Sequence, residues 1–133
     1  MDDLSIVGII IAALAFFVLG GVWYTVLFGK LWRAEMGISE EEAAGMSPNP
    51  LMFVWSILVA LVIAVTLAKL ISESSVEYGF KVGLGVGAGI GAAILAQNYV
   101  YESKSIRFFA INAGYVIVGL ALMGTIIGAF QTP

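Results

Sequence analysis

Apolar residues occur along the chain in four long runs separated by short polar segments. The runs cover about residues 4–28, 51–71, 75–101 and 106–130, and none carries an acidic residue away from its ends. A helix needs about 20 mostly apolar residues to cross the hydrocarbon layer of a bilayer. The pattern therefore predicts an all-α integral membrane protein, a bundle of four transmembrane helices that forms one domain over residues 1–133.

The third run is unusually rich in glycine, with six glycines in residues 79–101. Each would cost a soluble helix about 1 kcal/mol relative to Ala, whereas membrane helices use small residues to bring backbones together. With about 100° between successive residues of a helix, the small residues form a ridge on one side and a second face on the opposite side. The ridge is Gly79, Gly83, Gly87 and Gly91, and the second face is Gly85, Gly89, Ala92, Ala93 and Ala96. We therefore expect this helix to be the central one, packed on two sides.

The connection over residues 29–50 is the only long one. Its first part places its apolar side chains on one helical face, as expected of a short segment lying in the membrane interface; they are Phe28, Leu31, Trp32 and Met36. Ser39 with Glu42, and later Ser74 with Glu77, have the spacing of a capping box. The first predicts a short acidic helix, read as a solvated lid, and Pro50 suits the first turn of the second long helix.

Basic residues predict the orientation. Four lie beside the first and third connections (Lys30, Arg33, Lys104 and Arg107) and two on the other side (Lys69 and Lys81). Positive residues are enriched in cytoplasmic loops. This predicts that the first and third connections are cytoplasmic and that both termini are non-cytoplasmic.

The connection over residues 102–105 is so short that the third and fourth helices must be antiparallel neighbours. Contacting positions should then sum to about 210, which pairs Asn98 with Asn112 and Gly91 with Gly119, and, further along, Ile94 with Val116 and Gly87 with Met123. Polar groups at membrane depth are expensive without a partner. We expect an amide contact between the two asparagines, the alternative being a polar patch along a substrate path.

Aromatic residues gather toward the side of the first and third connections, among them Trp23, Tyr24 and Trp32. The simpler interpretation is a belt that anchors the helices in the interface. The alternative is an aromatic-lined site for a lipid or a quinone-like molecule.

The amino-acid composition excludes several kinds of catalytic and metal site. Of the 133 residues 61% are hydrophobic, and there is neither Cys nor His. Thiol catalysis, disulfides and the usual zinc ligands are therefore excluded, and no catalytic, metal or cofactor site is expected. The net charge of −3 carries no basic surface for nucleic acid.

Two stretches carry a family resemblance. The first comprises Gly21-Val22-Trp23-Tyr24, the residues 27–32 and Gly37; the second comprises residues 111–115 with Gly124 and Gly128. Together they resemble a bacterial family of small four-helix membrane proteins known as domain of unknown function 1761. The resemblance covers nearly the whole chain and implies the four-helix fold, without an activity or a substrate.

These features favour a non-enzymatic integral membrane protein of the bacterial inner membrane that acts through helix packing. It would be an accessory or structural subunit of a membrane complex, or a homo-oligomer, with membrane lipid, other subunits or itself as partners. The alternative is a small oligomeric transporter or channel. It would be passive, because no carboxylate lies in the membrane core to couple transport to protons.

Overall fold

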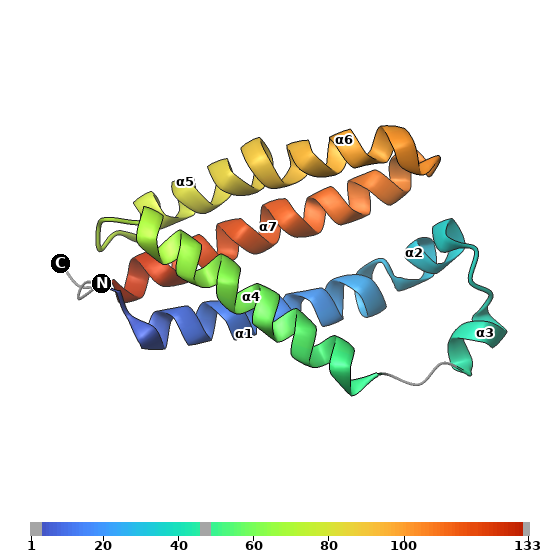
Figure 1. Cartoon of the computed structure of the whole chain (residues 1–133), viewed down its shortest axis with the longest axis horizontal. Helices are drawn as coiled ribbons and strands as arrows, with labels where there is room; N and C mark the ends of the chain where they lie inside the picture. The colour runs from blue at the N-terminus through green and yellow to red at the C-terminus, as the bar shows by residue number, and fades with distance from the viewer. Residues whose placement is uncertain (1–3, 46–48, 132–133) are drawn as a thin grey trace.

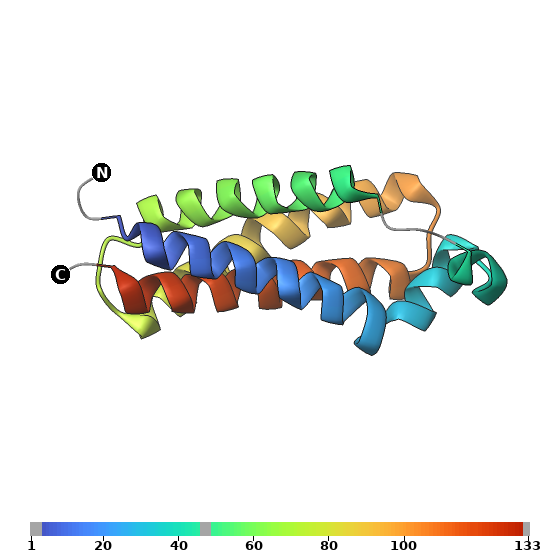
Figure 2. The same ribbon diagram turned by 90° about the horizontal axis from the view of Figure 1, so that it is seen from below.

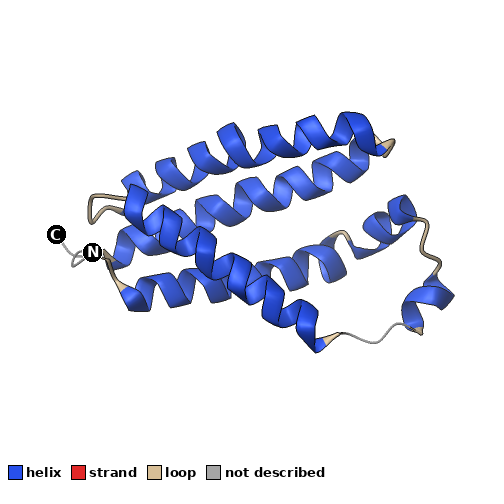
Figure 3. Cartoon of the chain, in the orientation of Figure 1, coloured by secondary structure: helices blue, strands red, loops and turns tan. Residues whose placement is uncertain are grey.

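All regular secondary structure in the part of the chain that the structure describes is helical (Figures 1 and 3). The computed structural model describes residues 4–45 and 49–131. In chain order the elements are α1 (Ile6–Val22), a π-helical turn η1 (Trp23–Leu27), α2 (Gly29–Met36), α3 (Glu40–Ala44), α4 (Pro50–Leu70), α5 (Val76–Val86), a second π-helical turn η2 (Gly87–Gly91), α6 (Ala92–Glu102) and α7 (Ile106–Phe130).

Four helical stretches are long and apolar enough to cross a membrane: Ile6–Leu27, Pro50–Leu70, Val76–Glu102 and Ile106–Phe130. The expected all-α architecture with four candidate spans is confirmed. The short helices α2 and α3 occupy the long connection, where an amphipathic segment and an acidic helix were predicted.

The caps follow the sequence with one correction. The Glu42 amide donates to Ser39 Oγ at 3.0 Å, as the first capping box predicts. The second cap is Ser75 and not Ser74, since the Tyr78 amide donates to Ser75 Oγ at 3.1 Å. Either serine could cap a helix, and tertiary packing decides, because the Ser75 carbonyl oxygen lies directly against Gly128 of α7.

The central helix of the bundle is α7, not the glycine-rich third span. It contacts α1, α2, α4, α5 and α6, whereas α5 packs almost entirely on α7. The second small-residue face of the third span is uncovered at Gly85 and Gly89, where a Cβ would meet nothing within 4 Å. The prediction of a helix packed on two sides was therefore wrong, because at Gly85 and Gly89 no other part of the described chain covers the second face.

The first glycine ridge does form a packing seam. Cβ atoms added at Gly79 and Gly83 would overlap the carbonyl oxygens of Gly124 and Leu120 on α7, and one at Gly128 would overlap that of Ser75. The backbones of α5 and α7 are thus in direct contact, which the glycines permit because they carry no Cβ.

Figure 2 shows that the described chain begins and ends at the same end of the bundle, and the buried core lies toward that end. There the buried positions are Ile9, Ala12, Ala13 and Phe16 of α1, Ala60, Ala64, Leu67 and Ala68 of α4, Ile71 just after it, and Leu120, Met123 and Ile127 of α7. Many are alanines, so these helices approach closely.

Gln131 joins three helices at this end. Its Nε2 donates to the carbonyl oxygens of Ala68 and Ile71, each at 2.9 Å, and its Oε1 accepts from the Ser5 amide at 3.1 Å. The side chain is buried, and it satisfies backbone groups at the start of α1 and the end of α4. The two ends of the described chain are thereby fixed side by side; the termini themselves, Met1 and Pro133, lie outside the described residues.

The opposite end of the bundle is open. Residues 51–59 of α4 are exposed or half-buried, and burial begins only at Ala60. Figure 1 shows α4 crossing α1 obliquely, so that its first half leaves the other helices. The bundle is therefore closed at the end that holds Ser5 and Gln131 and splayed at the end that holds α2 and α3.

Candidate functional site

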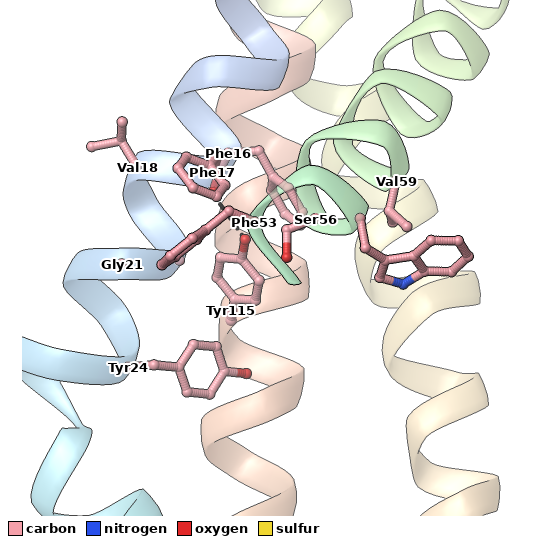
Figure 4. A pocket seen from close by; sticks show the side chains of 11 residues that line it. Phe16, Phe17, Val18, Gly21, Tyr24, Phe53, Ser56, Val59 and Tyr115 are labelled. Carbon is pink, nitrogen blue, oxygen red and sulfur yellow. Dashed lines mark hydrogen bonds between the residues drawn. The ribbon is translucent and has the colours of Figure 1, made fainter. Parts of the chain in front are cut away.

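A pocket of about 590 Å³ lies where the bundle splays, between α1, α4 and α7 (Figure 4). Its lining is almost wholly apolar and largely aromatic: Phe16, Phe17, Val18, Gly20, Gly21 and Tyr24 from α1 and η1, Phe53, Trp55, Ser56 and Val59 from α4, and Tyr115 from α7. Pockets of 300–1,000 Å³ are of the size that holds small ligands.

Three hydrogen bonds join α1 and η1 to α7 beside this pocket. Trp23 Nε1 donates to the Ile111 carbonyl at 2.9 Å. The Tyr24 hydroxyl donates to Asn112 Oδ1 at 2.6 Å, and the Tyr115 hydroxyl donates to the Phe16 carbonyl at 2.8 Å. Each of these three polar side-chain tips therefore has a hydrogen-bond partner on α7 or α1.

Glycines make room for the aromatic rings of this contact. A Cβ at Gly20 would lie 2.8 Å from the Tyr115 hydroxyl, and one at Gly114 would lie 2.9 Å from Cζ2 of Trp23. Each helix thus sets a large ring against a glycine of the other. Gly119 repeats the arrangement with Phe16, whose Cε1 lies 2.5 Å from the Cβ position.

The π-helical turn begins at Trp23, where α1 makes its hydrogen bonds to α7. A wide turn rotates successive side chains less than an α-helical turn does, so neighbours such as Trp23 and Tyr24 both reach α7. Such turns are rare and are frequent at functional sites.

Tyr115 is the centre of the aromatic cluster. Its ring centroid lies 4.6 Å from that of Phe16, 5.4 Å from Tyr24 and 6.3 Å from Trp23. Sequence reasoning did not propose it as a site residue, nor did it propose Gln131. The signal for Tyr115 was its place in the second stretch of the family resemblance, residues 111–115.

The aromatic residues proposed from the sequence do gather here. Trp32 packs edge-on against Tyr24 at 5.9 Å, and Phe28 lies 4.9 Å from Trp23. Gly37 ends α2 with φ 76°, a left-handed conformation that favours glycine. Tyr99 and Phe109 form a separate pair.

The predicted pairing of Asn98 with Asn112 is not formed. Asn112 bonds Tyr24 of η1 instead, and Asn98 lies exposed on α6 next to the exposed Gln97. Gly91 and Gly119 also do not face each other, because Gly91 lies against Val116 and Gly119 against Phe16.

The register prediction failed for a physical reason. It assumed an uninterrupted α-helix from Ser75 to Tyr101, whereas the π turn at Gly87–Gly91 inserts extra backbone and rotates the residues after it. Gly87 lies against Val116, Ile117 and Leu120 rather than Met123, and Gly83 before the turn is offset in the same way, against Leu120 and Ala121. Backbone contact at Gly79 and Gly83 fixes the register from the other end.

What this site offers a ligand is a defined shape and apolar contact. No group of three or more acidic side chains that could ligate a metal occurs within residues 4–45 and 49–131. The hydroxyls that line the pocket already donate to protein acceptors: Tyr24 to Asn112, Tyr115 to Phe16, and Ser56 to the Met52 carbonyl at 2.8 Å.

The two stretches that carry the family resemblance meet at this site. Trp23 and Tyr24 come from the first, and Ile111, Asn112 and Gly114-Tyr115 from the second. Neither a curated protein nor a solved structure matches the chain. A family model described as protein of unknown function DUF1761 matches residues 7–128, and the chain belongs to that family.

Proposed function

We propose that this protein is a non-enzymatic, multi-pass membrane protein that acts by associating with other membrane subunits or with further copies of itself. The observation that carries the proposal is the first half of α4, which leaves the bundle and is exposed over most of its circumference. Its large side chains include Leu51 and Trp55, 74% and 69% exposed.

Membrane insertion is part of the proposal. Side chains such as Ile6, Val26 and Val62 are also more than 60% exposed, and they belong to three separate elements. So many apolar surfaces on one small chain suit a lipid environment. A helix end that splays from its own bundle gives a neighbouring helix access from several sides, and in lipid such contacts depend on close packing.

Cysteine cross-linking tests the association, because the chain contains no Cys. Val54→Cys and Leu58→Cys place thiols one turn apart on exposed α4, and Ile90→Cys on η2 is the matched control, similarly exposed but distant in the fold. We expect bifunctional reagents to trap defined higher-mass species from native membranes through positions 54 and 58. A monomer in every mild detergent by native electrophoresis, together with no position-specific product, would contradict the proposal.

We further propose that α2, α3 and the turn between α6 and α7 face the cytoplasm of a bacterial inner membrane, with both termini outside. The Ser105 hydroxyl donates to Glu35 Oε2 at 2.5 Å, so the first and third connections share one end of the bundle with four basic residues. Impermeant maleimide applied to intact cells should label Glu73→Cys and spare Ser103→Cys. The reverse labelling would invert the orientation.

The alternative of a passive oligomeric pore is favoured by one feature, the exposed amides of Gln97 and Asn98 on α6. Several copies could line a polar path with these side chains. Solute flux into liposomes that disappears in a Gln97→Leu, Asn98→Leu variant would support the pore, and the absence of flux in the unaltered protein would exclude it.

A further inference from the structure

The aromatic pocket between α1, α4 and α7 has properties that define its occupant. It is apolar, and its three hydroxyls already donate to acceptors of the protein (Figure 4). No buried side-chain nitrogen or oxygen in the described part of the chain lacks a hydrogen-bond partner. The hydroxyls of the lining therefore offer a polar substrate no free donor, the indole N–H of Trp55 at the exposed edge is the one donor left, and a hydrocarbon chain requires none.

The pocket has the length and direction of a lipid chain. It follows α1 and η1 from Phe16 to Tyr24, about 12 Å at the helical rise, which is less than the roughly 15 Å of one leaflet's hydrocarbon. On α4 it follows Phe53 to Val59, in the half of that span nearest α3. It thus lies within one leaflet, on the side of the first connection.

A cationic group lies beyond the Tyr24 end of the pocket. Arg33 Nη1 and the Tyr24 carbonyl oxygen lie 3.2 and 3.0 Å from the position that a Cβ on Gly29 would occupy, so the guanidinium lies over Gly29, on the side of the Tyr24 backbone. Arg33 and Lys30 make no ion pair in the described part of the chain. Glu35, two residues along α2, accepts from the Ser105 hydroxyl and forms no ion pair with Arg33.

We propose that this pocket binds one acyl chain of an anionic phospholipid, with the phosphate beside Arg33. The proposal rests on membrane insertion but not on association with other subunits. The aromatic side chains that line the pocket contact the acyl chain, and Tyr24 and Tyr115 fix the depth of the pocket. The guanidinium of Arg33 recognises the phosphate oxygens, as Arg does in other phosphate sites.

Gly21 offers a clean way to block the site. It lines the pocket, and a Cβ there meets nothing within 4 Å, so Gly21→Leu fills pocket space without disturbing a helix contact. Gly85→Leu is the matched control, because Gly85 is equally open but lies on the outer face of α5, away from the pocket.

The test is photolabelling of the full chain in vesicles that contain phosphatidylglycerol with a diazirine on one acyl chain, with adducts mapped by mass spectrometry. We expect adducts concentrated on the pocket-lining residues, reduced severalfold in Gly21→Leu and unchanged in Gly85→Leu. Arg33→Gln should weaken labelling by phosphatidylglycerol about fivefold, from the worth of one basic residue near an anionic surface, with little effect on the phosphatidylcholine analogue.

Adducts spread evenly over exposed α4 and α5, and insensitive to Gly21→Leu, would overturn the proposal. Equal labelling by both lipids in the unaltered protein and in Arg33→Gln would overturn the recognition of the phosphate. A high-yield disulfide between copies through Ser56→Cys would show that a protein helix fills the pocket instead, which also overturns it. If positions 54 and 58 give no cross-linked product while the lipid still labels the pocket, the proposed association with other subunits is wrong and the lipid site stands.

Discussion

Gly83→Ala tests the contact between α5 and α7 most directly. A methyl at this position would overlap the Leu120 carbonyl oxygen and come within 2.9 Å of its carbonyl carbon and 3.1 Å of Ala121 Cα. All three are backbone atoms, so no side chain can rotate away. The two helices would have to part by about 1 Å to restore ordinary van der Waals contact.

The expected cost depends on the contacts that resist this movement. Gly79 and Ser75 also lie against the backbone of α7, at Gly124 and Gly128, so a separation at Gly83 would disturb these contacts as well. Overpacking of this kind costs about 1–3 kcal/mol, and we expect the upper end. Ala recovers about 1 kcal/mol in helix propensity. The net loss should be about 2 kcal/mol.

Reversible unfolding in mixed micelles, titrated with sodium dodecyl sulfate and followed by circular dichroism, would measure this loss. Gly85→Ala is the control, since its Cβ points into open space and should be neutral or slightly stabilising. Equal shifts of the unfolding midpoint for the two variants would refute the reasoning, because they would show that α5 and α7 separate freely.

Three further substitutions probe the rest of the bundle by the same titration. Gln131→Leu leaves the Ala68 and Ile71 carbonyls without their donor and should cost about 2 kcal/mol; an unchanged midpoint would show that water replaces the amide. Tyr24→Phe removes one bond to Asn112 and should cost only about 0.6 kcal/mol; a loss as large as that of Gln131→Leu would contradict this. Gly114→Ala presses on the Trp23 ring, which can shift, so it should cost about 1 kcal/mol and change the tryptophan emission; unaltered emission would mean that the ring does not lie there.

Local sequence determined the helical elements. Four apolar runs of spanning length, the Ser39 cap, the acidic helix and the amphipathic α2 all depend on residues within a few positions of one another, and the structure has each of them. The use of Gly79 and Gly83 as a contact face was also readable, because i, i+4 spacing places both on one side of a helix.

Tertiary structure alone decided how the helices are arranged. The third span has two small-residue faces of similar quality, and nothing local states that α7 covers one and that the other is left open at Gly85 and Gly89. The π turns at Trp23–Leu27 and Gly87–Gly91 rotate the residues beyond them, so Asn112 meets Tyr24 and Asn98 turns outward. The Gln131 contact joins the two ends of the chain and exists only once α1, α4 and α7 are assembled. Helix formation is governed by residues close in sequence, whereas the choice among equivalent faces and registers depends on the sum of contacts between residues far apart in it.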